Sequence, residues 1–184
     1  MDDRDRLRAL LLDRSVRRGD FVLSSGARST YYIDGRRTTM SGRGQLLIGR
    51  LGLATLDERA WRPAAVGGLT LGADPVAYAI AHTAALEDRA LDAFTVRKEP
   101  KGHGTGRRIE GSFEPGMDVV VVEDVVTTGE SALRAIAAVE AEGGRVLGVL
   151  AVVDREEGGR ERLEQAGYSL AALFTAAELL NVGG

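Results

Sequence analysis

Two acids followed by a loop of hydroxyl and glycine residues are the most informative chemical feature of the sequence. Glu123 and Asp124 follow four consecutive valines, and the loop T-T-G-E-S comes next, at 127–131. A helix is expected at 132–142, so its free backbone N–H groups and positive dipole end face the loop and can bind a phosphate. Carboxylates repel a phosphate unless they bind sugar hydroxyls or a hydrated metal ion. The pattern therefore predicts a sugar-phosphate site.

A simpler interpretation of this stretch is a strand, a turn and a helix in which the Ser and Thr residues only cap the helix. That alternative leaves the two adjacent acids at the end of an apolar strand unexplained. Gly129 favours the phosphate site, because a glycine lets the backbone approach an anion closely.

The basic segment 97–108, R-K-E-P-K-G-H-G-T-G-R-R, is a second candidate. It contains both lysines of the chain, Lys98 and Lys101, and one of the two histidines, His103. Its glycines and proline exclude a stable helix or an inner strand. Such a segment is either a solvated hairpin tip or a lid that closes on a polyanion and excludes water. The clustered positive charge favours the lid.

Aromatic residues and an arginine complete the candidate site. Tyr31 and Tyr32 lie on a predicted strand and so point to opposite faces, which means that at most one stacks on a given ligand. A core aromatic beside a surface aromatic explains the pair equally well. Arg155 follows an apolar strand, where open α/β sheets bind ligands. It can bind a carboxylate through two parallel hydrogen bonds or can be ordinary surface charge.

Strands and helices are expected to alternate along most of the chain. Strands are predicted at 64–66, 91–97, 119–122, 146–153 and 168–174. Helices are predicted at 2–18 (ended by Gly19), 41–60, 74–85, 132–142, 156–166 and 175–180. In the second helix we expect Leu46, Leu47, Leu51 and Leu56 to face the core, and a glycine-rich loop is expected at 67–73. The alternation predicts the α/β class, with a doubly wound parallel sheet and right-handed crossovers.

The N-terminal part falls outside this alternation. Short strands are expected at 21–23 and 29–33, around a turn at 24–27, and they should form a small separate cap. We therefore expect a single domain spanning 1–184, with an N-terminal hood mainly at 1–40 and a core at about 41–184.

Composition limits the classes of protein. A chain of 184 residues with a net charge of −3 fits one globular domain and does not indicate a general nucleic-acid surface. No apolar run reaches the roughly 20 residues that span a bilayer, and the charged N-terminus does not look like a signal peptide. The absence of cysteine excludes disulfides and thiolate zinc sites. The expected location is the cytoplasm, with no membrane partner.

Several motifs resemble one enzyme family. The stretch V-V-V-V-E-D-V-V-T-T-G-E-S resembles the phosphoribosyl diphosphate (PRPP) signature of the type I phosphoribosyltransferases. The segments F-V-L-S-S-G-x-x-S-x-Y-Y-I-D and R-K-E-x-K-x-H-G resemble the hood and the mobile catalytic loop of the orotate phosphoribosyltransferases, and 67–73 resembles their pyrophosphate loop. The resemblance implies transfer of the phosphoribosyl group from PRPP to orotate with Mg²⁺, giving orotidine 5′-monophosphate and pyrophosphate in pyrimidine synthesis. It also implies a homodimer whose 97–108 loop reaches the partner's site.

The resemblance also assigns roles to residues. The 5′-phosphate is bound by Thr127, Thr128, Gly129, Glu130 and Ser131. Glu123 and Asp124 would bind the ribose hydroxyls and lie near the cationic centre. The leaving pyrophosphate is neutralised by Arg97, Lys98, Lys101 and Mg²⁺, and His103 adds a proton or a hydrogen bond. Orotate is bound by Tyr31, Tyr32, Thr127 and Arg155. The resemblance thus implies Lys101, Asp124 and His103 as the catalytic residues, with Mg²⁺ held through PRPP and water.

Two positions depart from the family pattern. Ser24 and Leu71 stand where some members carry a lysine, so Arg28 or the 97–108 segment would supply more of the positive charge. One alternative function is a phosphoribosyltransferase for another base, which the hood motif and the lysine-bearing segment argue against. Another is a non-catalytic PRPP-binding regulator, which usually adds a DNA-binding domain. The short stretch ahead of the hood holds no basic recognition helix.

Overall fold

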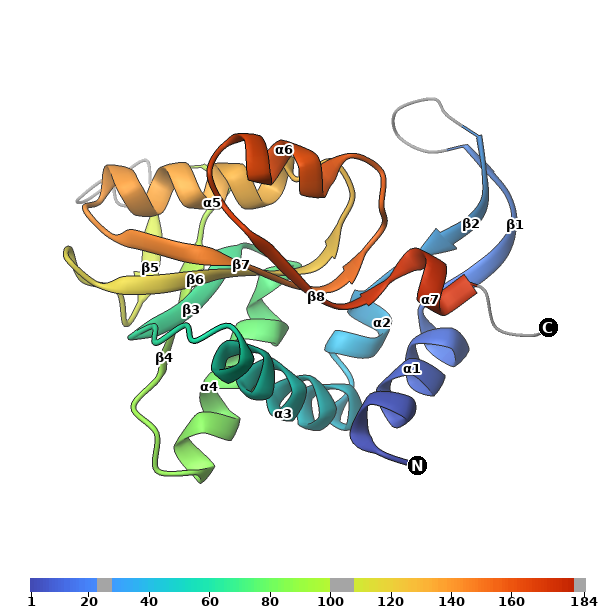
Figure 1. Ribbon diagram of the computed structural model, residues 1–184, viewed down its shortest axis with the longest axis horizontal. Coiled ribbons are helices and arrows are strands. Elements are labelled where there is room, and N and C mark those ends of the chain that lie inside the picture. The colour runs from blue at the N-terminus through green and yellow to red at the C-terminus, as the bar shows by residue number, and fades with distance from the viewer. Residues whose placement is uncertain (23–27, 100–107, 181–184) are drawn as a thin grey trace.

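The structure is a computed structural model of the chain, and it describes residues 1–22, 28–99 and 108–180 (Figure 1). The helices are α1 (Asp3–Arg14), α2 (Arg36–Thr39), α3 (Gly42–Glu58), α4 (Ala73–Leu86), α5 (Glu130–Ala141), α6 (Gly159–Gln165) and α7 (Ala176–Leu180). The strands are β1 (Val16–Val22), β2 (Arg28–Ile33), β3 (Ala65–Leu69), β4 (Asp92–Val96), β5 (Ile109–Gly111), β6 (Asp118–Val126), β7 (Arg145–Asp154) and β8 (Leu170–Thr175).

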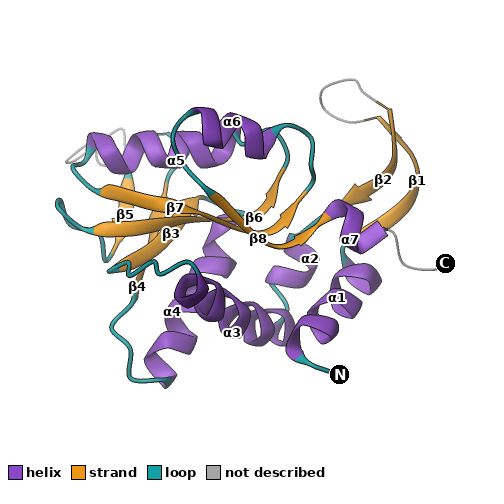
Figure 2. Ribbon diagram, in the orientation of Figure 1, coloured by secondary structure: helices purple, strands orange, loops and turns teal. Residues whose placement is uncertain are grey.

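A six-stranded sheet in the order β5-β4-β3-β6-β7-β8 forms the centre of the described chain. Its strands are parallel except β5, which pairs antiparallel with β4 at one edge. The helices α5 and α6 lie on one face of this sheet and α3 and α4 on the other (Figure 2). The doubly wound α/β fold predicted from the sequence is therefore confirmed, and the loops after the parallel strands meet at one edge of the sheet.

The valines of β6 show why this strand reads as a continuous apolar run. Val119 and Val121 pack into the cluster that contains the apolar face of α5. Val120 and Val122 pack into the cluster that contains the apolar faces of α3 and α4. Both faces of a covered parallel strand are buried, so both sets of side chains must be apolar.

The N-terminal strands β1 and β2 form a separate antiparallel ribbon that extends away from the main sheet (Figure 1). The helix α1 does not stand apart in the same way. Its Leu7 and Leu11 are fully buried in the cluster that also holds the apolar faces of α3 and α4. The division into a hood at 1–40 and a core at 41–184 stays a prediction, and α1 shares its apolar contacts with the larger part.

Several predicted boundaries were wrong. The first helix ends at Arg14 rather than at Gly19, because the chain continues directly into β1, where Gly19 has a φ of 154°. The predicted glycine loop begins later, since Gly67 and Gly68 belong to β3. A side chain at Gly67 would collide with Phe94 of β4, so this glycine serves close strand packing. The acids Glu123 and Asp124 lie inside β6, which continues to Val126.

The remaining differences concern α3, α6 and β5. Leu46 was expected in the core, but it is 48% exposed, whereas Leu53 on the same helix is buried. The helix α6 begins at Gly159 rather than at 156, and the short edge strand β5 was not predicted. None of the helices in the described ranges is long and apolar enough to cross a membrane.

Candidate active site

A cavity of about 360 Å³ opens between the N-terminal ribbon and the carboxyl ends of β3 and β6. It is bordered by the end of β2, the loop after β3, the end of β6 and the turn after β7. The lining residues are Tyr32, Ile33, Asp34, Gly35, Arg36, Leu69, Thr70, Leu71, Gly72, Lys98, Glu123, Asp124, Val125, Thr127, Ser131 and Arg155. The fold thus brings together predicted site residues that lie far apart in the sequence.

A smaller cavity of about 90 Å³ adjoins the first one at the start of α5. The two share Glu123, Val125, Thr127 and Ser131, and the smaller one is also lined by Thr128, Gly129 and Glu130. Gly129 is the N-cap residue of α5, with a φ of 75°, and no side chain caps this helix. The simpler interpretation, in which a Ser or Thr side chain caps α5, is therefore wrong. The free N–H groups at the start of α5 are left to bind an anion.

The helix α4 begins at the same cavity in a similar way. Its N-cap residue is Gly72, and again no side-chain hydrogen bond caps the helix. The loop before it is held by Asp74, whose two carboxylate oxygens accept hydrogen bonds from Thr70 Oγ1 at 2.7 Å and Thr95 Oγ1 at 2.9 Å. The cavity therefore lies between two helix N-termini, and each carries partial positive charge.

The two acids of β6, Glu123 and Asp124, lie in different environments. Glu123 is buried, whereas Asp124 is partly exposed to the cavity. Burial raises the pKa of Glu123 well above its ordinary value, and the negative charges of Asp124 and Asp74 act in the same direction. Glu123 therefore holds its proton to higher pH than an ordinary glutamate. A protonated Glu123 reduces the repulsion that two carboxylates would exert on a phosphate nearby.

Arg155 is a buried cation beside the ribbon. Its side chain is 6% exposed and lines the cavity, and its Cζ lies 5.1 Å from the centroid of the Tyr31 ring. Nη2 lies 2.6 Å from Glu157 Oε1, while the buried Nε makes no hydrogen bond. A buried guanidinium with an unused donor is suited to binding a carboxylate.

The two tyrosines occupy opposite faces of β2, as predicted. Tyr31 is partly buried and packs against the main cluster and Arg155. Tyr32 is 38% exposed, lines the cavity and lies against Phe21 with 5.8 Å between the ring centroids. Tyr32 is therefore the tyrosine that faces the cavity, and Tyr31 contacts Arg155.

The described part of the 97–108 segment lies at its two ends. Lys98 lines the cavity, and its carbonyl oxygen accepts hydrogen bonds from Arg134 Nη2 at 3.0 Å and Arg108 Nη2 at 3.2 Å. Arg97 is paired with Glu110 at 3.0 Å and is not among the described residues that line the cavity. The predicted catalytic residues Lys101 and His103 lie outside the described residues, as does Ser24.

Sequence reasoning did not single out Asp34, Gly35 and Arg36, which line the cavity directly after β2. The aspartate ends the hood motif, and that position was the available signal. Arg36 Nε donates to Asp34 Oδ1 at 3.0 Å, and this hydrogen bond raises the pKa of Arg36 further. Arg36 thus brings a cation to the cavity, which Leu71 also lines. Arg28, which was expected to supply positive charge, is exposed and is not among the described residues that line the cavity.

Comparison with known proteins decides the family. The orotate phosphoribosyltransferase of Aquifex aeolicus is 50% identical over 183 residues, which cover 98% of this chain and 99% of that protein. The chain belongs to the orotate phosphoribosyltransferase family. This confirms the family predicted from the sequence. It also confirms the prediction that the protein is an enzyme that transfers phosphoribosyl groups. No protein-family model matches the chain.

Solved structures of orotate phosphoribosyltransferase have the same fold. The Mycobacterium tuberculosis enzyme in complex with Fe(III) dicitrate is 47% identical, with a TM-score of 0.87, and the match covers 97% of this chain and 99% of that one. The complex of the M. tuberculosis enzyme with PRPP is 45% identical, with a TM-score of 0.83 over 97% and 99% of the two chains. An orotate phosphoribosyltransferase of this fold therefore binds PRPP.

Proposed function

We propose that the protein transfers the phosphoribosyl group of PRPP to orotate in the cavity between β2, β3 and β6. This reaction belongs to the de novo synthesis of pyrimidine nucleotides. The products are orotidine 5′-monophosphate and pyrophosphate. The observation that carries this proposal is the meeting of two uncapped helix N-termini, an acid pair and a buried arginine in one cavity. Family membership favours this reaction over the use of another base and over a role as a PRPP-binding regulator.

The anionic groups of PRPP determine where it binds in the cavity. Its 5′-phosphate binds the loop 127–131 at the start of α5, and its pyrophosphate binds the loop 70–72 at the start of α4. Arg36 and Lys98 also line the cavity, and they neutralise the pyrophosphate. Glu123 and Asp124 lie between the two helix N-termini and bind the ribose hydroxyls. The two anionic ends of PRPP are thereby fixed on either side of its ribose.

Orotate binds at the other end of the cavity. The guanidinium of Arg155 binds its carboxylate, Tyr32 flanks the ring, and Thr127 contributes a polar contact. Tyr31 holds Arg155 in place through the face of its ring. A base without a carboxylate leaves the buried Arg155 without a partner other than Glu157. This arrangement favours orotate over uracil.

The reaction breaks the bond between the ribose C1 and the pyrophosphate oxygen and forms a bond from C1 to a ring nitrogen of orotate. Positive charge develops on the ribose, and negative charge grows on the pyrophosphate. Asp124 stabilises the positive charge on the ribose, while Arg36, Lys98 and the N-terminus of α4 stabilise the negative charge on the pyrophosphate. The nitrogen of orotate is acidic enough to need no strong protein base, so positioning and electrostatics supply the catalysis. Lys101 and His103 are proposed to add to the charge on the pyrophosphate.

Mg²⁺ fits this site as an ion carried by the substrate. The described residues contain no group of three or more His, Asp or Glu side chains arranged to hold a metal. Mg²⁺ commonly binds through one or two carboxylates, substrate phosphates and water. Asp124 at the edge of the cavity offers such a carboxylate. When bound, the ion would supply positive charge beside the leaving pyrophosphate.

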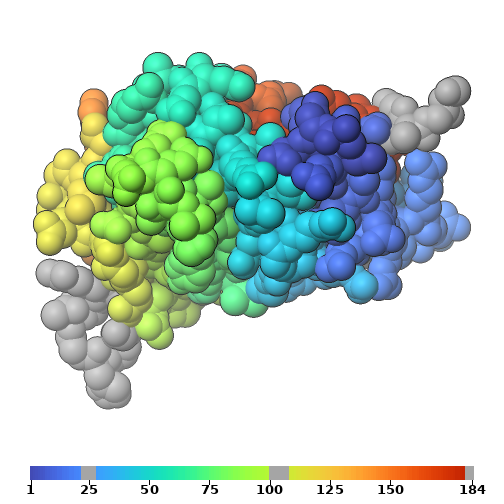
Figure 3. All heavy atoms as spheres, turned by 90° about the horizontal axis from the view of Figure 1, so that it is seen from below, coloured from blue at the N-terminus to red at the C-terminus, as the bar shows by residue number. Residues whose placement is uncertain are grey.

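A homodimer is part of the proposal, with the apolar groove between α3 and α4 as the contact between copies. This groove of about 640 Å³ is lined by Leu46, Tyr78 and Leu86, which are exposed. Figure 3 shows the face of the molecule that α3 (teal) and α4 (green) form. Arg50 and Glu87 also line the groove, so a two-fold arrangement can set the arginine of each copy against the glutamate of the other. Exposed apolar patches of this kind mark contact surfaces.

The first experiment is an assay of substrate. The protein is mixed with PRPP and Mg²⁺, and the loss of ultraviolet absorbance of orotate is followed, with hypoxanthine and uracil tested in parallel. We expect turnover with orotate alone, and a large loss of activity in Asp124→Asn with PRPP binding weakened. Turnover with uracil instead would overturn the assignment of Arg155. PRPP binding without turnover of any base would support the regulator.

The second experiment tests the shared site. Inactive Lys101→Ala subunits are mixed with inactive Asp124→Asn subunits, and recovered activity is expected if the 97–108 segment serves the partner's cavity. Sedimentation of Leu46→Glu, which places a charge in the groove, tests the contact between copies. No recovery at any ratio, together with a dimeric Leu46→Glu variant, would contradict both parts. A cytoplasmic location also stays a prediction, tested by fractionating cells that produce the protein.

A further inference from the structure

The short helix α7 is held almost entirely by contacts to other parts of the chain. It spans five residues, Ala176–Leu180, which is too short to be stable by itself. Thr175 and Glu178 form a capping box, in which Glu178 N donates to Thr175 Oγ1 at 3.2 Å and Thr175 N donates to Glu178 Oε2 at 2.8 Å. Leu179 is fully buried. The position of α7 is therefore set by its neighbours.

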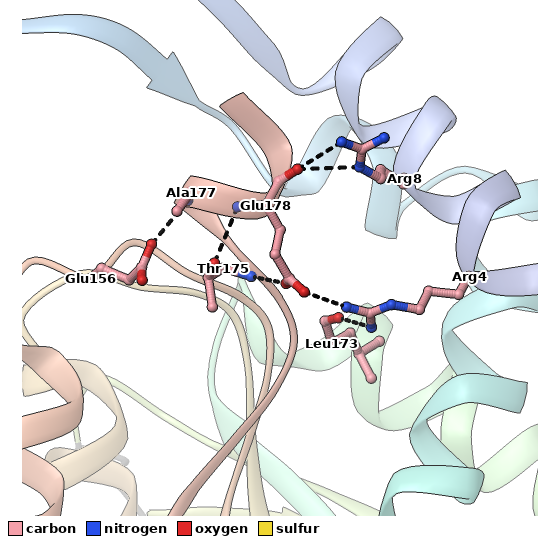
Figure 4. Close-up of polar contacts among 7 residues, drawn as sticks. All are labelled: Arg4, Arg8, Glu156, Leu173, Thr175, Ala177 and Glu178. Atoms are coloured by element: carbon pink, nitrogen blue, oxygen red, sulfur yellow. Dashed lines mark hydrogen bonds and ion pairs between the residues drawn. The ribbon is translucent and has the colours of Figure 1, made fainter. Parts of the chain in front are cut away.

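On one side, α7 is fixed to the N-terminal helix by two arginines (Figure 4). Arg4 Nη2 lies 2.8 Å from Glu178 Oε1, and Arg4 also donates to the carbonyl of Leu173. Arg8 donates to the carbonyl of Glu178 through Nε at 3.2 Å and Nη2 at 2.8 Å. Glu178 thus receives contacts at three oxygen atoms, two of its carboxylate and one of its backbone.

The ribbon is attached to the same helix. Arg18 of β1 donates from Nη2 to the carbonyl of Leu180 at 3.0 Å, so it satisfies an unpaired carbonyl at the end of α7. β1 pairs with β2, and the pair Arg18–Tyr31 stands in register. The strand that carries Tyr31 is therefore connected to α7 through its direct partner.

On the other side, α7 holds the turn that carries Arg155. Glu156 Oε2 accepts a hydrogen bond from Ala177 N at 2.9 Å, close to the start of α7 (Figure 4). Glu156 has a φ of 59°, an unfavourable conformation for a side-chain-bearing residue, so its contacts must hold it there. The buried Asp154 supports the turn from within, since it accepts from Glu156 N at 2.9 Å and pairs with Arg160.

We infer that Glu156 and Glu178 are positioning residues for orotate, which act through α7. The helix ties the turn of Arg155 to α1 and to the ribbon that carries Tyr31 and Tyr32. The two walls that enclose the base come from distant parts of the sequence, and α7 touches both. This inference rests on the proposed binding of orotate by Arg155 and deepens it, because it names what fixes Arg155 relative to the tyrosines.

The contacts of α7 fix its position more than they stabilise the folded protein. The side chains of Arg4 and Glu178 are 48% and 46% exposed, and exposed ion pairs add little to the free energy of unfolding. Removing the Glu178 side chain should raise the KM for orotate on the order of fivefold, the size of effect that the loss of a helix cap can have. The KM for PRPP should stay within about twofold, since, beyond its capping box, the hydrogen bonds and ion pairs of α7 in the described chain go to α1, β1 and the Arg155 turn and not to the loops 70–72 and 127–131.

The experiment measures both KM values and kcat in five variants: Glu178→Ala, Glu156→Ala, Glu156→Gln, Arg155→Ala and Glu161→Ala. Glu156→Gln keeps an acceptor for Ala177 N and should restore the orotate KM that Glu156→Ala raises. The exposed Glu161 on α6 is the matched control, and its loss should change neither KM. The thermal midpoint of each variant reports any general loss of folding.

The outcomes distinguish the role of α7 from the binding of orotate by Arg155. A raised orotate KM in Glu178→Ala and Glu156→Ala, with rescue by Glu156→Gln, supports the positioning role. Equal rises in both KM values, or no rescue, would overturn it and leave α7 a purely structural element. If Arg155→Ala itself leaves the orotate KM unchanged, the proposed binding of orotate fails first. If the KM for orotate rises strongly in Arg155→Ala but keeps its wild-type value in Glu178→Ala and Glu156→Ala, only the role of α7 is refuted.

Discussion

Gly72 lies against Asp124 so closely that a Cβ atom at position 72 would come within 2.5 Å of Asp124 Oδ1 and 3.0 Å of Glu123 Oε1. The loop at the start of α4 therefore approaches the acid pair only because residue 72 has no side chain. Gly35 makes a similar approach from the other side, where a Cβ would lie 2.9 Å from Asp124 Oδ2. Asp124 thus lies between two glycine backbones, at positions where a side chain would collide with its carboxylate.

Replacing Gly72 with alanine should impair the use of PRPP. The added methyl group pushes the loop or Asp124 out of place, and we expect kcat/KM for PRPP to fall about tenfold or more. The matched control is Gly42→Ala at the start of α3, because a Cβ there meets nothing within 4 Å. Steady-state kinetics of the two variants check this prediction, and equal kinetics would contradict the role of the close approach.

Gly129→Ala should weaken PRPP binding through the backbone. Gly129 has a φ of 75°, and an alanine in this region costs roughly 1–2 kcal/mol. The backbone is expected to relax toward negative φ and to turn the N–H groups of the loop away from the phosphate. Gly116→Ala introduces the same kind of strain at a φ of 91° with no atom nearby. Both variants should lose stability, but only Gly129→Ala should raise the Kd for PRPP in calorimetry.

Glu123 should make the free energy of unfolding depend on pH. Burial raises the pKa of Glu123 in the folded protein above its ordinary value of 4.5, so the folded state binds this proton more tightly than the unfolded state. The contribution of Glu123 to stability is therefore complete below pH 4.5 and is lost as the pH rises through the folded pKa. Glu123→Gln has no proton to lose.

Urea unfolding of the wild type and Glu123→Gln checks this expectation. As the pH rises from 4.5 toward neutrality, the free energy of unfolding of the wild type should fall relative to that of Glu123→Gln. Asp124 and Asp74 are the charged neighbours that act on Glu123, so Asp74→Asn should reduce this fall. A difference between the two proteins that stays constant across the range would show that Glu123 ionises as an ordinary glutamate.

Asp74→Asn should loosen the loop at the start of α4. The carboxylate accepts from both Thr70 and Thr95, and an amide has only one oxygen to accept with. We expect kcat/KM for PRPP to fall several-fold, about the worth of one hydrogen bond of 0.5–1.5 kcal/mol. Asp88→Asn, on the exposed turn after α4, is the control. Unchanged PRPP kinetics in Asp74→Asn would show that the loop is held without this residue.

The sequence predicted best what depends on local pattern. The valines of β6, the loop 127–131 and the start of α5 follow from apolar runs and from the types of the neighbouring residues. The doubly wound parallel sheet and the opposite faces of Tyr31 and Tyr32 follow from the alternation of elements and of side chains. These are short-range signals, and the structure agrees with them except that α5 begins at Glu130, two residues before the predicted start at 132.

The errors depend on contacts between distant segments. Gly67 looks like part of a turn, and only its packing against Phe94 shows that it belongs to a strand. Leu46 and Leu47 are both apolar, and the docking of α3 decides which of them is buried. Arg36 becomes a cavity residue because the chain folds back over β6, which no local pattern reveals. Such placements follow from the assembled fold.

The hydrogen bond from Arg97 N to Arg108 O, at 2.8 Å, has a consequence for the evolution of this enzyme. Together with the pairing of β4 and β5, it joins the two ends of the lysine-bearing segment at the edge strand of the sheet. Doubling the length of a loop between fixed ends costs only about 0.6 kcal/mol. Lengthening the chain between these ends therefore costs little free energy of folding. Selection can tune this segment for catalysis while the sheet beneath it stays unchanged.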